Sequence, residues 1–286
     1  MNLLLLGESK TGKTVFMAQL YERATSVPDA ALRLKTTPGQ MKVVEEALQR
    51  LLQGKAPEHT RTGTTGTIVL PLLGVNGREV DLVWPEYAGE TFLKVLRERH
   101  LTPTWRDRIL AANGILLMIR PHLKRGPRDV LEAPRRAEGD APRAADEEDD
   151  EDQPLAPDAQ FVELLQLLSF ARGDGRLHRS TIPMTVVLSC WDELRQDNAE
   201  VTVPAAELAK HYPLLAAYLK GAWAPEEVTI LGLSAWGGPF SEDLGSRFAE
   251  LGPAGRGYMI DEQGQEDLDL TRVLTRLIEM AYARST

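Results

Sequence analysis

The chain has 286 residues, of which 43% are hydrophobic, which is enough for one large α/β domain or two small ones, and it has no run of about 18 apolar residues that would predict a membrane span. The net charge of −9 comes almost entirely from residues 138–152, which hold nine acids and one arginine, so the composition indicates neither a broad acidic surface nor a nucleic-acid groove. The single cysteine, Cys190, excludes an internal disulfide and favours a reducing, cytoplasmic setting, and the five histidines lack the spacing of zinc ligands.

The N-terminal residues predict a phosphate-binding loop between a strand and a helix. Residues 2–7, NLLLLG, form an apolar run that ends in glycine and is typical of a fully buried parallel strand. Residues 7–14, GESKTGKT, match the pattern G-x-x-x-x-G-K-[ST], and helical spacing follows them. Backbone N–H groups and the helix dipole would then surround an anion. The motif predicts phosphate binding but does not choose between GTP and ATP.

Each residue type in this loop suits a phosphate site. Gly7 and Gly12 would let the backbone wrap the phosphates without a Cβ in the way. Lys13 would reach the β- and γ-phosphates, and the Thr14 hydroxyl would bind Mg²⁺. The remaining predicted nucleotide-binding residues of the loop are Glu8, Ser9, Lys10 and Thr11. Lys10 has two open interpretations, a positive charge beside the phosphates or a side chain that points to solvent.

Helix and strand patterns alternate along the rest of the chain. Predicted helices cover 13–24, 38–54, 91–101, 158–172 (with Asp158 as N-cap) and 266–284, and predicted strands cover 67–73 and 79–84 as a hairpin, 112–121, 182–190 and 227–236. This alternation predicts an α/β, three-layer fold: a mainly parallel sheet with one antiparallel strand and helices on both faces. Residues 122–157 are rich in proline, arginine and acids, so we expect a disordered insertion within a single domain, 1–286.

The order of these elements resembles the translation-factor and Ras-like (TRAFAC) class of P-loop GTPases. In that class a threonine before the hairpin binds Mg²⁺ and senses the γ-phosphate, and Thr64 and Thr65 hold about this position. The family's Asp-x-x-Gly follows the hairpin, where this chain has EYAG: Glu86 would hold the magnesium shell through a water, and Gly89 would contact the γ-phosphate. Glu90 stands where Ras-like members position the attacking water, often with glutamine. The predicted catalytic residues are Lys13, Thr65, Gly89 and Glu90, and the predicted metal ligands are Thr14, Thr64, Thr65 and Glu86.

Later motifs of the class concern the base. The segment VVLSCWDEL stands where the class has Asn-Lys-x-Asp, so the resemblance implies that Asp192 reads guanine, while Ser189 and Cys190 replace the usual asparagine and lysine. The pair Ser234 and Ala235 matches the family's Ser-Ala, whose backbone contacts the guanine oxygen. Trp191 has two open interpretations, a cover for the base or a hydrophobic plug.

The resemblance implies a guanine-nucleotide switch that binds GTP or GDP with Mg²⁺, hydrolyses GTP slowly and signals to a protein partner. More narrowly, the chain is similar to divergent bacterial GTPases of the double-GTPase type, encoded in conflict or phage-defence systems. Two alternatives remain open from the sequence. One is a P-loop ATPase in which Asp192 binds Mg²⁺ and Glu193 polarises water. The other is a nucleotide-gated interaction module that does not hydrolyse.

Overall fold

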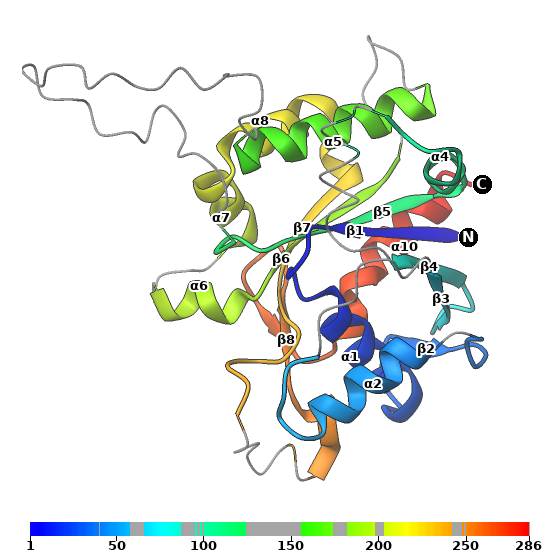
Figure 1. Ribbon diagram of the computed structural model, residues 1–286, viewed down its shortest axis with the longest axis vertical. Coiled ribbons are helices and arrows are strands. Elements are labelled where there is room, and N and C mark those ends of the chain that lie inside the picture. The colour runs from blue at the N-terminus through cyan, green and yellow to red at the C-terminus, as the bar shows by residue number, and fades with distance from the viewer. Residues whose placement is uncertain are drawn as a thin grey trace, which may run out of the picture.

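The fold is built on one mixed sheet. In the computed structural model, the described part of the chain forms nine strands in the order β2-β3-β4-β1-β5-β6-β7-β8-β9 (Figure 1). The structure describes residues 1–39, 41–57, 66–86, 95, 98, 100–123, 156–173, 182–197, 203–241, 248 and 250–285. The predicted insertion at 122–157 lies almost wholly outside these residues and stays a prediction, as does the helix at 91–101, of which only 95, 98, 100 and 101 are described.

Five parallel strands form the centre of the sheet. They are β4 (Glu79–Glu86), β1 (Asn2–Gly7), β5 (Gly114–Ile119), β6 (Met184–Ser189) and β7 (Val228–Ser234). Every residue of β5 and β6 is buried, as expected where helices cover both faces of a parallel sheet. Successive leucines of β1 enter different cores: Leu3 and Leu5 join one, and Leu4 and Leu6 join the other. The predicted fold class is confirmed.

Antiparallel strands complete both edges. The predicted hairpin is confirmed as β3 (Gly66–Gly74) and β4, and β2 (Leu32–Leu34) pairs with the outer side of β3. At the other edge, β8 (Tyr258–Ile260) runs antiparallel to β7, and β9 (Glu266–Asp267) pairs with β8. The sheet therefore has a second antiparallel strand, β8, that the sequence analysis did not predict. A strand of three residues is too short to show a periodic pattern.

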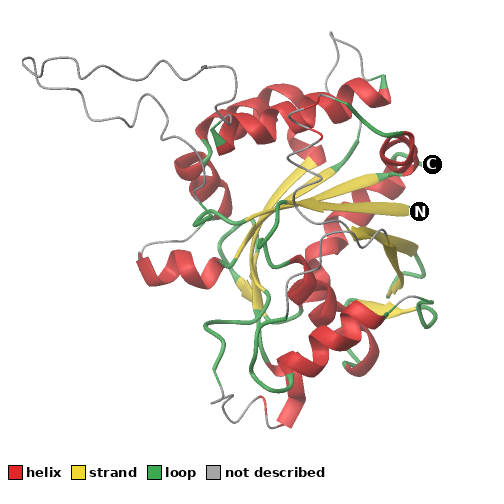
Figure 2. Cartoon of the chain, in the orientation of Figure 1, coloured by secondary structure: helices red, strands yellow, loops and turns green. Residues whose placement is uncertain are grey.

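Two helix layers cover the sheet (Figure 2). The core on one face includes α1 (Lys13–Ser26), α2 (Lys42–Leu51) and α10 (Thr275–Ala283). The core on the other face includes α4 (Pro103–Ala111), α5 (Pro157–Arg172), α6 (Trp191–Asp197), α7 (Pro204–His211) and α8 (Pro213–Ala222). Among the described residues, no helix combines the length and apolar character that crossing a bilayer requires.

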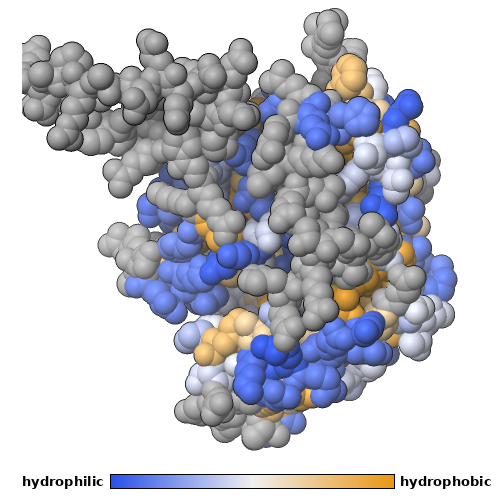
Figure 3. All heavy atoms as spheres, viewed as in Figure 1, coloured by the Kyte–Doolittle hydropathy of each residue, from blue (hydrophilic) through white to orange (hydrophobic). Residues whose placement is uncertain are grey.

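Helix α2 shows how an amphipathic pattern becomes a covering layer. Its buried residues, Val44, Ala47 and Leu51, are spaced by three and four positions and therefore lie on one side of the helix. They join the same core as Phe16, Met17 and Leu20 of α1. The side of α2 that faces the viewer in Figure 3 is hydrophilic.

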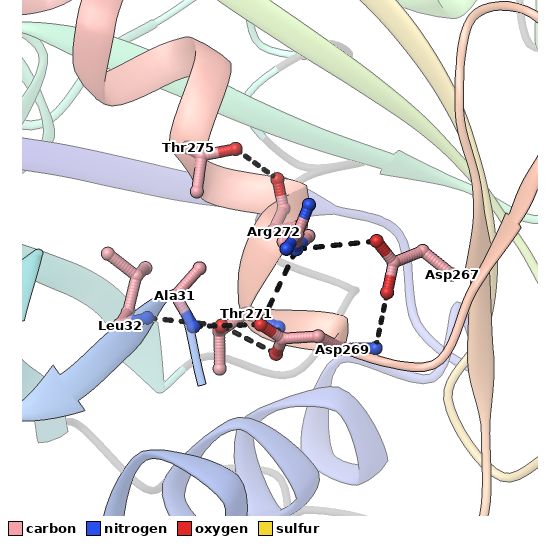
Figure 4. Close-up of polar contacts among 7 residues, drawn as sticks. All are labelled: Ala31, Leu32, Asp267, Asp269, Thr271, Arg272 and Thr275. Atoms are coloured by element: carbon pink, nitrogen blue, oxygen red, sulfur yellow. Dashed lines mark hydrogen bonds and ion pairs between the residues drawn. The ribbon is translucent and has the colours of Figure 1, made fainter. Parts of the chain in front are cut away.

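The C-terminal segment is joined to edge strand β2 by a polar cluster (Figure 4). The Asp269 carboxylate accepts a hydrogen bond from the backbone N–H of Ala31 (2.8 Å), and the Thr271 hydroxyl accepts one from the N–H of Leu32 (3.2 Å). The other Asp269 oxygen accepts bonds from the N–H and the hydroxyl of Thr271, which is fully buried. A buried backbone donor of β2, at Leu32, and a partly buried one just before it, at Ala31, are thereby satisfied from the C-terminal segment.

This cluster also corrects the prediction of one continuous helix over 266–284. Residues 266 and 267 belong to β9, residues 270–274 form a 3₁₀ helix, and α10 begins only at Thr275. Asp269 starts the 3₁₀ turn because its carboxylate caps the N–H of Thr271. The amphipathic spacing of the segment did not reveal this cap.

Asp158 caps a different helix from the one predicted. The N-cap of α5 is Ala156, and Asp158 lies in the first turn. Its two carboxylate oxygens accept hydrogen bonds from the backbone N–H groups of Leu214 and Leu215 at the start of α8, both at 2.7 Å. The prediction that Asp158 caps its own helix is wrong, because this carboxylate satisfies the open donors of its neighbour, α8 (Figure 1).

Replacing Asp158 with alanine should lower the free energy of unfolding by about 1–2 kcal/mol, since two N–H groups of α8 lose their acceptor. Asp158→Asn keeps one carbonyl acceptor and should lose about half as much. Urea denaturation of the three proteins measures the difference. An alanine variant as stable as the wild type would contradict the capping role.

Candidate functional site

The predicted nucleotide-binding segments meet where the central parallel strands have their carboxyl ends, which is called the sheet edge of the site below. Strand β1 ends at Gly7, β6 at Ser189 and β7 at Ser234, and these strands are parallel with β5 between β1 and β6. The loops that follow their carboxyl ends therefore lie along the same edge, which is where ligands of such sheets bind.

The backbone of the phosphate loop requires glycine at two places. At Gly7 φ is 154°, and a Cβ there would lie 2.6 Å from the carbonyl oxygen of Met118 on β5. Gly12 has φ 77° and immediately precedes α1. Lys10 also lies in the left-handed region, with φ 63°, although it carries a side chain. The loop thus wraps tightly against β5 and leads its N–H groups to the start of α1.

Lys13 is held inside this loop. Its ammonium group donates hydrogen bonds to the carbonyl oxygens of Gly7 (2.8 Å) and Glu8 and to the Thr11 hydroxyl (3.2 Å). The residue is only 9% exposed, and burial lowers the pKa of Lys13 to about 8, against the opposing effect of the Glu8 carboxylate. Lys10, in contrast, is exposed, which favours its solvent interpretation. Ser9 is also exposed.

The candidate magnesium ligands are only partly described. Thr14 lies in the first turn of α1 and is partly buried. The backbone of Glu86 ends β4, and the last β1–β4 pair, Leu4 with Val83, lies three residues before both Gly7 and Glu86. A hydroxyl and a carboxylate oxygen are hard donors that fit Mg²⁺. The predicted Thr64, Thr65, Gly89 and Glu90 lie outside the described residues.

Asp192 and Ser234 are in direct contact. The Ser234 hydroxyl donates a hydrogen bond to the Asp192 carboxylate and accepts one from the N–H of Gly237 (3.0 Å). Asp192 comes from the first turn of α6 and Ser234 from the end of β7. The following loop is tight, because a Cβ on Gly257 would lie 2.6 Å from the carbonyl oxygen of Ala235. The carboxylate predicted to read the base is thereby fixed at the same sheet edge as the phosphate loop.

The residues before Asp192 have structural roles. Trp191 is fully buried, and a Cβ on Gly232 would lie 2.6 Å from its ring, so its position favours the hydrophobic plug over the base cover. The Ser189 hydroxyl donates a hydrogen bond to the carbonyl of Ile119 (3.1 Å). Burial raises the pKa of the Cys190 thiol to about 12, so this residue is neutral. Its sulfur lies 4.0 Å from a Cβ placed on Gly12, beside the phosphate loop.

Arg120 is a site residue that the sequence analysis missed. It follows β5, and its guanidinium binds the Glu193 carboxylate (3.0 and 2.5 Å) and the carbonyl oxygen of Lys10 (3.0 Å). The only sequence signal is an arginine that ends the apolar run ILLMIR. This pairing also bears on the ATPase alternative, because Glu193 is bound by Arg120 and Asp192 by Ser234. The Glu193 carboxylate, which that alternative assigns to polarising water, is thus already held in an ion pair.

The solved structures that match the chain share little of its sequence. The chain is 12% identical to a bacterial selenocysteine-specific elongation factor EF-Sec, with a TM-score of 0.36; the alignment covers 82% of this chain and 25% of that one. It is also 12% identical to the GTP-bound GTPase-like domain of Ski7 from S. cerevisiae, with a TM-score of 0.45; this alignment covers 82% of this chain and 42% of the other. It is 17% identical to a signal recognition particle receptor structure, SRb-GTP/SRX, from Chaetomium thermophilum (TM-score 0.39, covering 84% of this chain and 94% of that one). The chain thus spans less than half the length of the first two.

A family model matches almost the whole chain, whereas no curated protein sequence matches it. The model of the Double-GTPase 1 family matches residues 4–277, a range that includes the phosphate loop, the Asp192 segment and Ser234. The chain therefore belongs to the Double-GTPase 1 family.

Proposed function

We propose that this protein is a Mg²⁺-dependent guanine-nucleotide switch that hydrolyses GTP to GDP slowly and signals to a protein partner. The observation that carries the proposal is the Asp192 carboxylate, held by Ser234 at the sheet edge that also bears the phosphate loop. Membership of the Double-GTPase 1 family supports guanine as the base.

Asp192 has the chemistry to select guanine. Guanine presents two N–H donors, at N1 and N2, to a carboxylate, whereas adenine presents an acceptor at N1. A carboxylate has about four lone-pair sites, so the bond from Ser234 leaves capacity for both donors. An adenine base would instead place its N1 acceptor against the carboxylate, with no hydrogen between them, which is costly.

The phosphate end would combine backbone, lysine and metal. The loop N–H groups and the α1 dipole would bind the phosphates, with Lys13 as the buried cation. Thr14 and Glu86 would hold Mg²⁺, which when bound neutralises charge on the β- and γ-phosphates.

Slow hydrolysis and signalling complete the proposal. Glu90 would place a carboxylate beside a triphosphate, which repels the charge that in-line attack of water develops. Thr64 or Thr65 and Gly89 would report the γ-phosphate, so the loops at 55–66 and 86–100 would differ between the GTP and GDP states. A partner residue would then accelerate cleavage. The double-GTPase resemblance supports a role in bacterial anti-phage defence.

Asp192→Asn should weaken GTP and GDP binding at least about tenfold, because one of the two base hydrogen bonds becomes a donor–donor contact. The same variant should bind xanthosine nucleotides more tightly, since xanthine carries a carbonyl in place of the guanine amine. Competition against a fluorescent GDP measures all three affinities. Asp29→Asn, an exposed position before β2, is the control. Displacement of labelled GDP by ATP as readily as by GTP would contradict guanine selectivity.

Nucleotide affinity should fall as pH rises through about 8. In the free protein the lowered pKa of Lys13 means that its positive charge is lost above this pH, whereas bound phosphate favours the charged form. The dissociation constant for GDP should therefore rise by up to about tenfold per pH unit between pH 8 and 9. Lys13→Arg keeps its charge over this range and should give a flatter profile. Identical profiles for both proteins would rule out Lys13 as the titrating group.

Glu90→Gln should increase the single-turnover rate of GTP hydrolysis roughly tenfold, equivalent to about 1.4 kcal/mol of barrier, because the repelling charge is removed. Quenched single-turnover assays on the isolated chain provide the rate. A slower variant would identify Glu90 as a base, and no cleavage by either protein would favour the interaction module that does not hydrolyse.

A further inference from the structure

Arg120 connects two parts of the candidate site. Its Nη1 donates a hydrogen bond to the carbonyl oxygen of Lys10 in the phosphate loop, and its Nε and Nη2 bind both oxygens of Glu193 on α6. The Arg120 and Glu193 side chains are 27% and 30% exposed. A paired, partly buried fork of this kind is more rigid and stronger than an exposed ion pair. The phosphate loop and the helix that carries Asp192 are therefore tied to the same guanidinium.

Position 190 carries no positive charge of its own, because the side chain is a cysteine. Cys190 stands where the resembling class has the lysine of its base motif, and its thiol is neutral. The charge of Arg120, which directly follows the neighbouring strand β5, acts on this thiol. A positive charge is thus present beside position 190, but it comes from another element.

The contact at Lys10 also fixes the direction of a loop N–H. Lys10 has φ 63°, a conformation that costs free energy for a residue with a Cβ. A trans peptide holds its C=O and the next N–H in opposite directions. The bond from Arg120 to the Lys10 carbonyl therefore orients the N–H of Thr11, which the motif assigns to the phosphate site.

We propose that Arg120 is a positioning residue that holds the phosphate loop in its nucleotide-binding conformation and couples it to α6, in place of the lysine that the base motif lacks. This inference rests on the proposed guanine-nucleotide site and identifies how that site is held together. Glu193 aims the guanidinium, and the Lys10 carbonyl receives it.

The test compares Arg120, which binds Glu193 of α6, with Arg195, which belongs to α6. Arg195 lies on α6 itself, pairs with Glu266 of β9 at 2.8 Å and lies over the Tyr258 ring of β8, so these contacts hold α6 to the far strands of the sheet. Arg120→Gln should weaken both GDP and GTP binding about tenfold, whereas Arg195→Gln should stay within about twofold of the wild type. Thermal unfolding of the nucleotide-free proteins controls for a general loss of stability. Equal affinities of the two variants would overturn the proposal.

Two further variants separate positioning from a merely structural role. Cys190→Lys in the Arg120→Gln background moves the cation to the position that the family motif uses. The double variant should bind GDP about threefold or more tightly than Arg120→Gln alone. Lysine is not β-branched, which suits the left-handed backbone at Cys190 (φ 54°). Arg120→Lys keeps the charge without the fork and should show an intermediate loss, a comparison that remains decisive if the glutamine variant does not fold. The positioning role would be overturned if Cys190→Lys restored no affinity in the Arg120→Gln background and Arg120→Lys bound GDP as tightly as the wild type.

The same titrations distinguish this proposal from the proposed function. A wild-type chain that bound no guanine nucleotide would contradict the function itself. Tight binding by the wild type that Arg120→Gln retains would overturn only the role of Arg120.

Discussion

The site depends on the burial of β1 on both faces of the sheet. Leu3 and Leu5 pack into one core, and Leu4 and Leu6 pack into the other, so a slip of the strand along its axis would bring the flanking Asn2 or Gly7 to a core position that a leucine now fills. This constraint delivers Gly7 to a fixed point so close to the Met118 carbonyl that a Cβ does not fit. The packing of β1 in the core therefore fixes the position of the phosphate loop, and α1 follows the loop. Packing far from any ligand therefore sets the geometry of the phosphate end.

Local patterns predicted the elements that carry their own signal. The strand-loop-helix unit at the N-terminus and the β3–β4 hairpin are contiguous in sequence, and their residues show both the periodicity and the turn chemistry. The contacts that escaped prediction join distant residues: Arg120 with Glu193, and Asp158 with Leu214. A carboxylate near a helix start is equally compatible with its own helix and with a neighbour that the fold brings alongside. Only the tertiary arrangement decides which donors it meets.

Trp191 and Asp192 are adjacent in sequence, but the tertiary arrangement gives them different roles. Trp191 and Asp192 begin α6, and consecutive residues of a helix point in directions about 100° apart. Trp191 enters the core against Gly232, whose missing side chain leaves room for the ring, while Asp192 meets Ser234. The tryptophan fixes the start of α6 and thereby the direction of the carboxylate next to it. The base segment, in which Ser189 and Cys190 replace the usual asparagine and lysine, is thus held by packing and by Ser234.

Charge at this edge of the sheet is nearly balanced before any nucleotide binds. Among the described side chains of the site, Arg120 is neutralised by Glu193, Lys10 extends to solvent, and Lys13 is buried with a lowered pKa. Glu8 adds a negative charge beside Lys13. In the proposed complex a triphosphate would meet Lys13 as the one available cation among the described side chains of the site, and it would otherwise rely on backbone N–H groups, the α1 dipole and the proposed metal ion. It follows that the proposed switch would draw much of its discrimination between GTP and GDP from Mg²⁺ and the γ-phosphate together, with side-chain cations contributing less.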